Sequence, residues 1–134
     1  LSSCYSGKRL DYFSELPNLY ANAKININIF HTQCVTAPNP RVYDVLACGG
    51  FLLTGYVSGL EDEFQIGQEL EVYRTRDELK EKIRYYLAHA HKRKEIACKG
   101  QAKVLARCGY HDRMQIFLNQ LSSRTKETYV YICR

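Results

Sequence analysis

The chain has 134 residues, which is the usual length of a single domain. Apolar residues make up 46% of the sequence and charged residues 25%, and this balance excludes a disordered or collagen-like chain. The longest apolar runs, such as residues 51–53, are far shorter than the roughly 20 residues that a membrane-spanning helix needs.

Strand and helix patterns alternate along the first half of the chain. A short helix is predicted over residues 15–22, where Pro17 is tolerated in the first turn. Ile25, Ile27 and Ile29 then alternate with asparagines, which predicts a strand over residues 25–30. Residues 31–38 are expected to form a loop.

A second helix is predicted over residues 40–48. Asn39 is a favoured N-cap residue, and Pro40 suits the first helical position. Gly49 can adopt the left-handed conformation that ends a helix. The buried face is expected to hold three residues spaced i, i+3 and i+4, namely Val42, Val45 and Leu46.

Two further strands are predicted over residues 51–54 and 70–73, with a loop between them that has a helical turn at 60–64. Thr75 and Glu78 then form a capping box that opens a helix. One face of this helix is expected to hold Leu79, Ile83, Tyr86 and Leu87. Another helix over about 91–107 aligns Ile96, Gly100 and Val104, and a third over about 110–121 aligns Met114, Phe117, Leu118 and Leu121.

Three short strands separated by helical crossovers predict an α/β fold with a parallel sheet. We expect one domain over residues 1–134, with a β/α sheet part at 15–73, a helical part at 75–121 and a tail at 122–134 that the pattern does not assign. The strand at 25–30 would lie at an open edge of the sheet. Either one half of a doubly wound sheet is therefore absent from the chain, or a second copy pairs there to form a homodimer.

The net charge of +5 is unevenly distributed. Residues 74–107 carry eleven basic and four acidic side chains, whereas residues 1–73 carry four basic and eight acidic ones. A basic segment attracts phosphate-rich partners. Because Glu78, Glu81 and Glu95 lie among the bases, a solvated helical surface is the simpler interpretation, and we expect no nucleic-acid partner.

The cysteines and the start of the chain bear on where the protein resides. The six cysteines leave a disulfide framework open, but Cys34, Cys48 and Cys98 lie in apolar segments, which favours buried reduced thiols. The chain begins at Leu1 with no secretory signal pattern. We therefore expect a cytoplasmic protein that has no transmembrane segment and that is processed or cut from a longer chain.

Two sequence features are candidates for ligand chemistry. His89 and His91 are expected to mark a turn between helices rather than a metal site. The start of the helix at Pro40 follows a parallel strand, where α/β sheets bind ligands, and its free N–H groups suit a diphosphate. Arg41 can add a bidentate contact to phosphate, and Asp44, one turn further, can accept hydrogen bonds from sugar hydroxyls. The alternative is a capped helix with an ordinary Arg41–Asp44 surface pair.

Residues 39–54 read Asn-Pro-Arg-Val-Tyr-Asp-Val-Leu-Ala-Cys-Gly-Gly-Phe-Leu-Leu-Thr. This segment resembles the signature of group 1 glycosyltransferases of the spore-maturation (CgeB-like) type. The resemblance extends over about residues 10–107. It implies the GT-B architecture, in which two Rossmann-like domains face a cleft. The chain is similar to the second half of the C-terminal domain of such enzymes, so the expected fold is a partial Rossmann-like one.

The resemblance also implies roles for single residues. Asp44 occupies the position that binds the donor ribose, and Asn39 and Arg41 are expected to contact phosphate or shape the loop. Thr36 stands where the broader group has an acidic residue that contacts the transferred sugar, and Ala37 lies in a segment that is glycine-rich in those relatives.

The expected substrate is a nucleotide-diphosphate sugar, with an unknown acceptor and no metal or other cofactor. The resemblance also implies that the chain alone is incomplete for catalysis, because the acceptor domain is absent. The alternative functions are a basic module that binds nucleic acid or another anionic partner, and a self-associating module.

Overall fold

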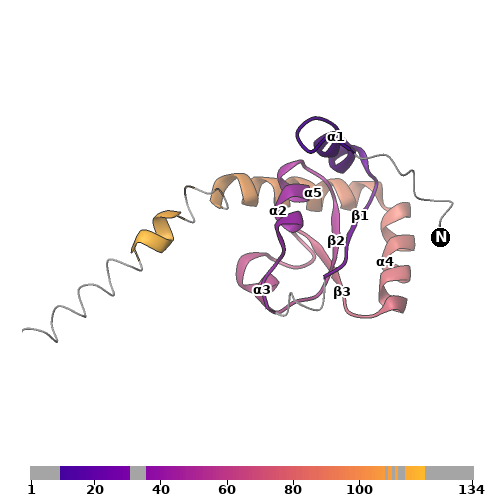
Figure 1. Ribbon diagram of the computed structural model, residues 1–134. Coiled ribbons are helices and arrows are strands. Elements are labelled where there is room, and N and C mark those ends of the chain that lie inside the picture. The colour runs from indigo at the N-terminus through magenta and orange to yellow at the C-terminus, as the bar shows by residue number, and fades with distance from the viewer. Residues whose placement is uncertain (1–9, 31–35, 108, 110, 112–113, 120–134) are drawn as a thin grey trace, which may run out of the picture.

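The computed structural model describes residues 10–30, 36–107, 109, 111 and 114–119 (Figure 1). In chain order the elements are α1 (Glu15–Asn22), β1 (Asn26–Asn28), α2 (Pro40–Ala47), β2 (Leu52–Gly55), α3 (Gly59–Glu63), β3 (Glu71–Tyr73), α4 (Arg76–Ala88) and α5 (Ala90–Arg107). Residues 114–119 are also helical. The predicted helix at 110–121 is thus observed in part, and Leu121 and the tail lie outside the described residues.

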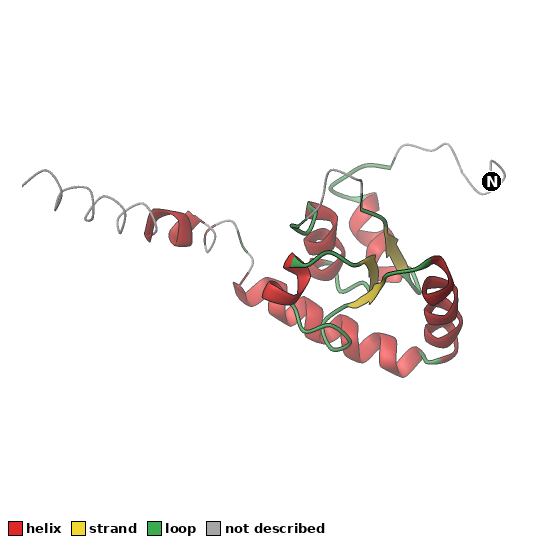
Figure 2. Ribbon diagram, turned by 90° about the horizontal axis from the view of Figure 1, so that it is seen from below, coloured by secondary structure: helices red, strands yellow, loops and turns green. Residues whose placement is uncertain are grey.

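The three strands form one parallel sheet in the order β1-β2-β3, which confirms the predicted α/β class. Ile27 is paired with Leu53, and Thr54 with Val72. Helices lie on both sides of this sheet (Figure 2). β1 is the edge strand among the described elements, and pairing with a second copy stays a prediction.

Two apolar clusters pack on opposite faces of the sheet. The larger one joins α2 and the second half of α5 to the sheet, and its members are Val42, Val45, Leu46, Leu52, Val57, Leu60, Phe64, Leu70, Val72 and Val104. The smaller one lies under α4, and its members are Phe51, Leu53, Tyr86, Ile96 and Ala97. The predicted buried faces of α2 and α5 are therefore confirmed. The predicted face of α4 is wrong at Leu87, which is 50% exposed.

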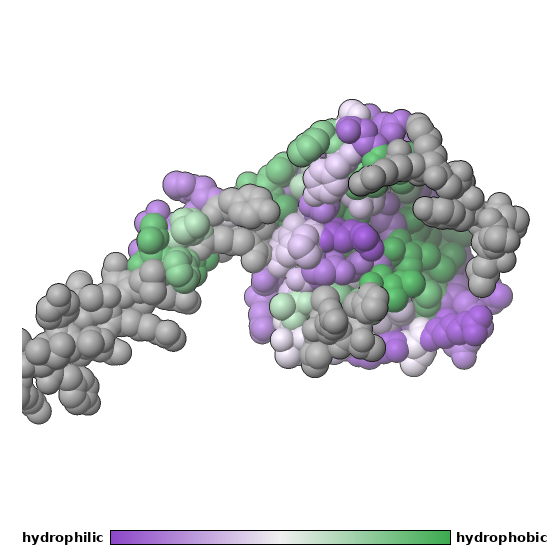
Figure 3. Space-filling model, in the orientation of Figure 1, coloured by the Kyte–Doolittle hydropathy of each residue, from purple (hydrophilic) through white to green (hydrophobic). Residues whose placement is uncertain are grey.

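Strand β1 turns its asparagines toward the protein interior. Asn28 is fully buried, whereas Ile27 is 44% and Ile29 is 72% exposed. Ile27 is paired with Leu53 of the smaller cluster, so it lies on the face of the sheet opposite α2. Figure 3 shows apolar side chains gathered on the surface beside β1 and α4. The predicted strand at 25–30 is longer than the observed one because the register with β2 ends at the Asn28–Thr54 pair.

The element boundaries at the glycines and histidines agree with the sequence. Gly49 has a φ of 74°, which is the left-handed conformation predicted after α2. Gly50 follows it where a Cβ would lie 2.6 Å from the carbonyl oxygen of Tyr20, so only glycine fits there. His89 separates α4 from α5, which confirms the predicted turn at that residue, whereas His91 lies in the first turn of α5.

The cysteine prediction is only partly correct. Cys48 and Cys98 are free thiols, and Cys48 is half-buried. Cys98 is exposed, which contradicts its predicted burial, because it lies on the outer side of α5 between the buried Ala97 and Gly100. Cys34 lies outside the described residues.

A buried carboxylate fixes α4 on the sheet. Glu71 Oε2 accepts a 2.6 Å hydrogen bond from the hydroxyl of Tyr86, and Oε1 accepts one of 3.1 Å from Lys82 Nζ. Lys82 also forms a 2.9 Å ion pair with Glu78, one helical turn earlier. All four residues lie on β3 or α4, so this network sets the position of that helix.

The Tyr86 hydroxyl is expected to make stability fall at alkaline pH. Burial and the neighbouring Glu71 raise its pKa above the ordinary value of 10.0, so the folded state keeps a proton that the unfolded state releases. This contribution is complete below about pH 10 and is lost as the pH rises above it. In urea unfolding, Tyr86→Phe should be about 1–3 kcal/mol less stable than the wild type at pH 8. Above about pH 10 the variant should lose less stability with rising pH than the wild type does. Parallel pH profiles would contradict this assignment.

Candidate functional site

The start of α2 lies at the edge of the sheet where the strands end. Asn39 is the N-cap residue, but its side chain makes no capping hydrogen bond. Instead Asn39 Nδ2 donates to Asn28 Oδ1 at 3.3 Å, and Asn28 Nδ2 donates to Asn39 Oδ1 at 3.2 Å. Asn28 Nδ2 also donates to the hydroxyl of Thr54 at 3.0 Å. The strands β1 and β2 therefore hold the Asn39 side chain, and the first N–H groups of α2 receive no side-chain cap from Asn39.

Arg41 and Asp44 do not form the surface pair of the alternative interpretation. Arg41 is exposed in the first turn of α2, and no ion pair or hydrogen bond of its side chain is found among the described residues. Asp44 is half-buried, and its Oδ2 accepts a 3.2 Å hydrogen bond from the hydroxyl of Tyr12. Among the described residues, no side chain therefore occupies the guanidinium, while the carboxylate faces the loop before α1.

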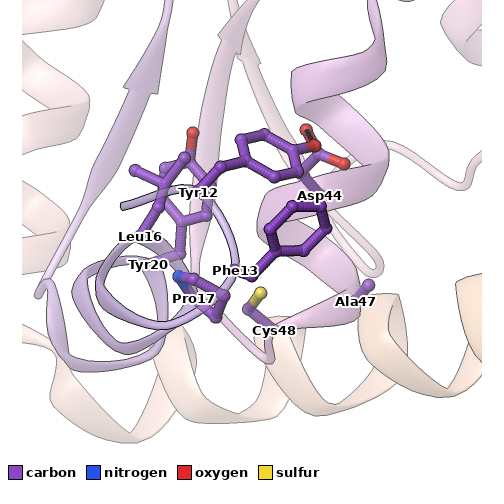
Figure 4. A pocket seen from close by; sticks show the side chains of 8 residues that line it. All are labelled: Tyr12, Phe13, Leu16, Pro17, Tyr20, Asp44, Ala47 and Cys48. Carbon is purple, nitrogen blue, oxygen red and sulfur yellow. Dashed lines mark hydrogen bonds between the residues drawn. The ribbon is translucent and has the colours of Figure 1, made fainter. Parts of the chain in front are cut away.

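A cavity of about 190 Å³ lies between α2 on one side and α1 with the segment that leads into it on the other (Figure 4). Its walls are mainly apolar, and Asp44 is the one carboxylate among the described side chains that line it. The thiol of Cys48 also lines it, and burial together with the charge of Asp44 raises the pKa of that thiol. The other lining residues are Tyr12, Phe13, Leu16, Pro17, Tyr20 and Ala47.

Thr36 and Ala37 lie against the start of α3 rather than on α2. The carbonyl oxygen of Thr36 accepts a 2.8 Å hydrogen bond from the N–H of Gly59. A Cβ at position 59 would overlap that oxygen and lie 3.5 Å from the Cα of Ala37. This close approach fixes the backbone that leads into Asn39, and both side chains are exposed. The structure therefore gives these two residues a backbone role in shaping the loop.

A second cavity, of about 330 Å³, was not predicted from the sequence. It lies at the carboxyl ends of all three strands and is lined by Ile29, Phe30, Gly55, Tyr56, Tyr73 and Arg74. The guanidinium of Arg74 lies 3.9 Å from the centre of the Tyr56 ring and 3.7 Å from Glu61. The places of Tyr56 and Arg74 in the sequence could have indicated this cavity. Both residues directly follow a strand, β2 and β3, and ligands bind where parallel strands end.

The basic helices carry many ion pairs. Glu95 pairs with Lys92 at 3.2 Å and with Lys99 at 2.9 Å, and Lys80 pairs with Asp77 at 2.9 Å. These pairs favour the interpretation of a solvated helical surface, and the expected lack of a nucleic-acid partner stays a prediction. Within the described ranges, three or more His, Cys, Asp or Glu side chains do not gather into a group that could hold a metal ion.

The topology and the position of α2 define the class of the protein. A parallel sheet with helices on both faces, and a helix start at the carboxyl edge of its strands, is a Rossmann-like arrangement. Across the part of the chain that the structure describes, no helix is long and apolar enough to cross a membrane.

The family follows from comparison with known proteins. The chain belongs to the glycosyl transferase-like family, whose model matches residues 3–119. No curated protein and no solved structure matches the chain significantly. The family match confirms a glycosyltransferase domain, while the spore-maturation subtype and the position within a GT-B enzyme stay predictions.

Proposed function

We propose that the chain binds the nucleotide-sugar donor of a glycosyl transfer reaction, with the donor diphosphate at the start of α2. The observation that carries this proposal is the uncapped N-terminus of α2 beside an exposed Arg41, in a chain of the glycosyltransferase-like family. N–H groups at a helix start and a guanidinium both bind phosphate oxygens.

Asp44 supplies the second contact of the proposed site. A carboxylate accepts hydrogen bonds from two neighbouring hydroxyl groups, such as those of a ribose. Asp44 lies on α2 one turn beyond Arg41. Its Oδ2 already accepts a hydrogen bond from one hydroxyl group, which belongs to Tyr12. The donor nucleoside thus lies along α2, with its phosphates toward Pro40 and its ribose toward Asp44.

The proposed chemistry is the stabilisation of the departing diphosphate. Negative charge develops on the leaving group as the bond to the sugar breaks, and the helix dipole with Arg41 lowers the energy of that charge. This mechanism uses no metal ion. The acceptor would be supplied from outside the described residues, and a cytoplasmic location agrees with the use of nucleotide sugars as substrates.

A titration of the amide NMR spectrum tests the proposal directly. The full 134-residue chain would be titrated with UDP, GDP and ADP and with their sugar conjugates. We expect one nucleotide series to shift the amides of residues 39–44, and Arg41→Gln to weaken its binding about tenfold. Arg84→Gln, at an exposed arginine of α4, is the matched control. Unchanged amides at millimolar nucleotide would refute the proposal for this chain.

The open edge of β1 supports a second proposal, self-association through that strand. Ile27 and Ile29 are exposed beside the edge of β1 that no other described strand pairs with, and open edges pair with other chains. Sedimentation velocity should show a dimer that Ile29→Lys weakens, and a monomer at all concentrations would contradict it.

A further inference from the structure

The second cavity, at the carboxyl ends of the three strands, has a floor that a glycine leaves open. Gly55 lines this cavity and is paired with Tyr73 in the parallel register. A Cβ on Gly55 would lie 3.4 Å from Cδ2 of Phe30 and 3.8 Å from the Tyr73 hydroxyl oxygen. A side chain at this position would therefore occupy part of the cavity, whose volume is about 330 Å³. Pockets for small molecules begin at roughly 300 Å³, so the cavity is large enough for one.

Hydrogen bonds hold the aromatic walls of this cavity in place. The Tyr73 hydroxyl donates to the carbonyl oxygen of Asn28 at 3.1 Å, which ties the end of β3 to β1. The N–H of Tyr56 donates to the carbonyl oxygen of Tyr73 at 3.0 Å, which ties β2 to β3 beyond their last paired residues. None of the described residues that line the cavity lies on α2. The cavity is therefore preformed and separate from the proposed diphosphate site.

The groups around the cavity match those of a sugar ring. The C–H groups of a sugar carry partial positive charge and pack on the electron-rich faces of aromatic rings, which Phe30, Tyr56 and Tyr73 supply here. The hydroxyl groups of a sugar both donate and accept hydrogen bonds. Arg74 lines the cavity and supplies N–H donors, and Glu61, 3.7 Å from its guanidinium, supplies acceptors. Apolar faces and polar edges are thus both provided for.

The charges at the rim of the cavity favour a neutral ligand. The Arg74 guanidinium lies 3.9 Å from the centre of the Tyr56 ring, and this stacking holds it beside the cavity. An arginine by itself selects carboxylate or phosphate groups. Here the carboxylate of Glu61 offsets the positive charge, and both side chains are about half exposed. An anion is repelled by one member of the pair and a cation by the other, so a neutral sugar fits best.

We propose that this cavity binds one neutral sugar ring of a saccharide that is distinct from the nucleotide-sugar donor. The ring packs on the aromatic walls, one of its edges enters the space above Gly55, and its hydroxyl groups contact Arg74 and Glu61. The inference goes beyond the proposed function and does not depend on it, because no described residue of α2 lines the cavity. The chain can therefore hold a nucleotide and a saccharide at the same time.

NMR titration of the full chain with neutral sugars tests the proposal. Amide spectra would be recorded with the methyl glycosides of glucose, galactose, mannose and N-acetylglucosamine, up to tens of millimolar. We expect at least one of them to shift the amides of residues 55, 56, 73 and 74. Amides that stay unchanged with all four glycosides would overturn the proposal.

Gly55→Ala is the sharpest variant, because it fills the floor of the cavity without steric overlap. Both contacts of the added methyl group would lie at ordinary van der Waals distances, so the variant should fold. We expect it to lower the affinity for the sugar about fivefold. Tyr56→Leu should lower this affinity by a similar factor, and Tyr56→Phe, which keeps the ring, should retain it. Unchanged affinity in both Gly55→Ala and Tyr56→Leu would refute the assignment of the sugar to this cavity.

Two further variants separate a specific effect from a general one. Tyr85→Leu removes a half-exposed ring from α4, outside this cavity, and should leave the affinity for the sugar unchanged. Glu61→Gln removes the carboxylate beside Arg74. It should raise the affinity for methyl glucuronide, an anionic sugar, about threefold relative to methyl glucoside. A preference of the wild type for the glucuronide would contradict the neutral ligand.

Adding UDP, GDP or ADP to the sugar-saturated chain distinguishes this proposal from the proposed function. The shifts at residues 55, 56, 73 and 74 should persist, and loss of these shifts through competition would overturn the separate saccharide site. If the sugar binds and none of the nucleotides does, the proposed function fails while the saccharide site stands. If a nucleotide binds and none of the sugars does, the saccharide site alone is refuted.

Discussion

Replacing Asp44 with asparagine is expected to lower the affinity of the chain for its nucleotide ligand by roughly 10- to 100-fold. A hydrogen bond to an ionised acceptor contributes about 1.5–3 kcal/mol, and asparagine offers only one carbonyl oxygen in place of two charged ones. The change keeps an acceptor for the Tyr12 hydroxyl, so the loop before α1 should stay in place. Calorimetric titration of the wild type and Asp44→Asn measures the difference.

The stability of Asp44→Asn should remain within about 1 kcal/mol of the wild type. The Tyr12–Asp44 hydrogen bond is exposed, and exposed bonds contribute little to folding. Asp62→Asn, at an exposed carboxylate of α3, is the matched control and should bind nucleotide normally. Equal affinity of Asp44→Asn and wild type would show that this carboxylate does not hold the ribose, whatever the role of Arg41.

Gly100→Ala is expected to destabilise the fold by about 2 kcal/mol, although alanine favours helices. A Cβ at position 100 would overlap the carbonyl oxygen of Glu69 and lie 2.8 Å from Leu46 Cδ2. Both neighbours are fixed, because Leu46 is fully buried and Glu69 lies in a hydrogen-bonded turn. Overpacking of this kind costs about 1–3 kcal/mol, whereas an unhindered helical glycine would gain about 1 kcal/mol on replacement by alanine.

Chemical denaturation decides between steric overlap and helix preference by whether Gly100→Ala lowers or raises the urea midpoint. A lower midpoint in urea with an unchanged slope would confirm the close approach of α5 to the loop before β3. A higher midpoint would contradict it, since the helix preference of alanine would then outweigh the steric overlap. Gly100 is central to the fold because α5 packs there against α2, the helix that carries Arg41 and Asp44.

Local sequence signals predicted the elements well where one residue type dictates a conformation. Pro40 and Gly49 bound α2 because proline and glycine have backbone preferences that few contexts override. The buried face of α2 followed from spacing alone. The extent of the first strand was predicted poorly, because the alternation over residues 25–30 says nothing of where pairing with β2 ends.

The candidate site was predicted only for the part that lies on one helix. Asn39, Arg41 and Asp44 are close together in sequence, so helix geometry alone relates them. Tyr12 lies 32 positions from the carboxylate it contacts, and no local pattern could pair the two. The partner of the Asn39 side chain was also beyond prediction, because Asn39 has the identity of a capping residue and is held by Asn28 instead.

The reciprocal amide pair between Asn28 and Asn39 has a consequence for the rotational phase of α2. A helix that packs by smooth apolar contacts can turn slightly about its own axis, whereas two paired amides allow one orientation. Arg41 and Asp44, three residues apart, point about 60° from each other around that axis. The hydrogen bonds between Asn39 and the buried Asn28 of β1 therefore fix the directions in which the guanidinium and the carboxylate leave the helix.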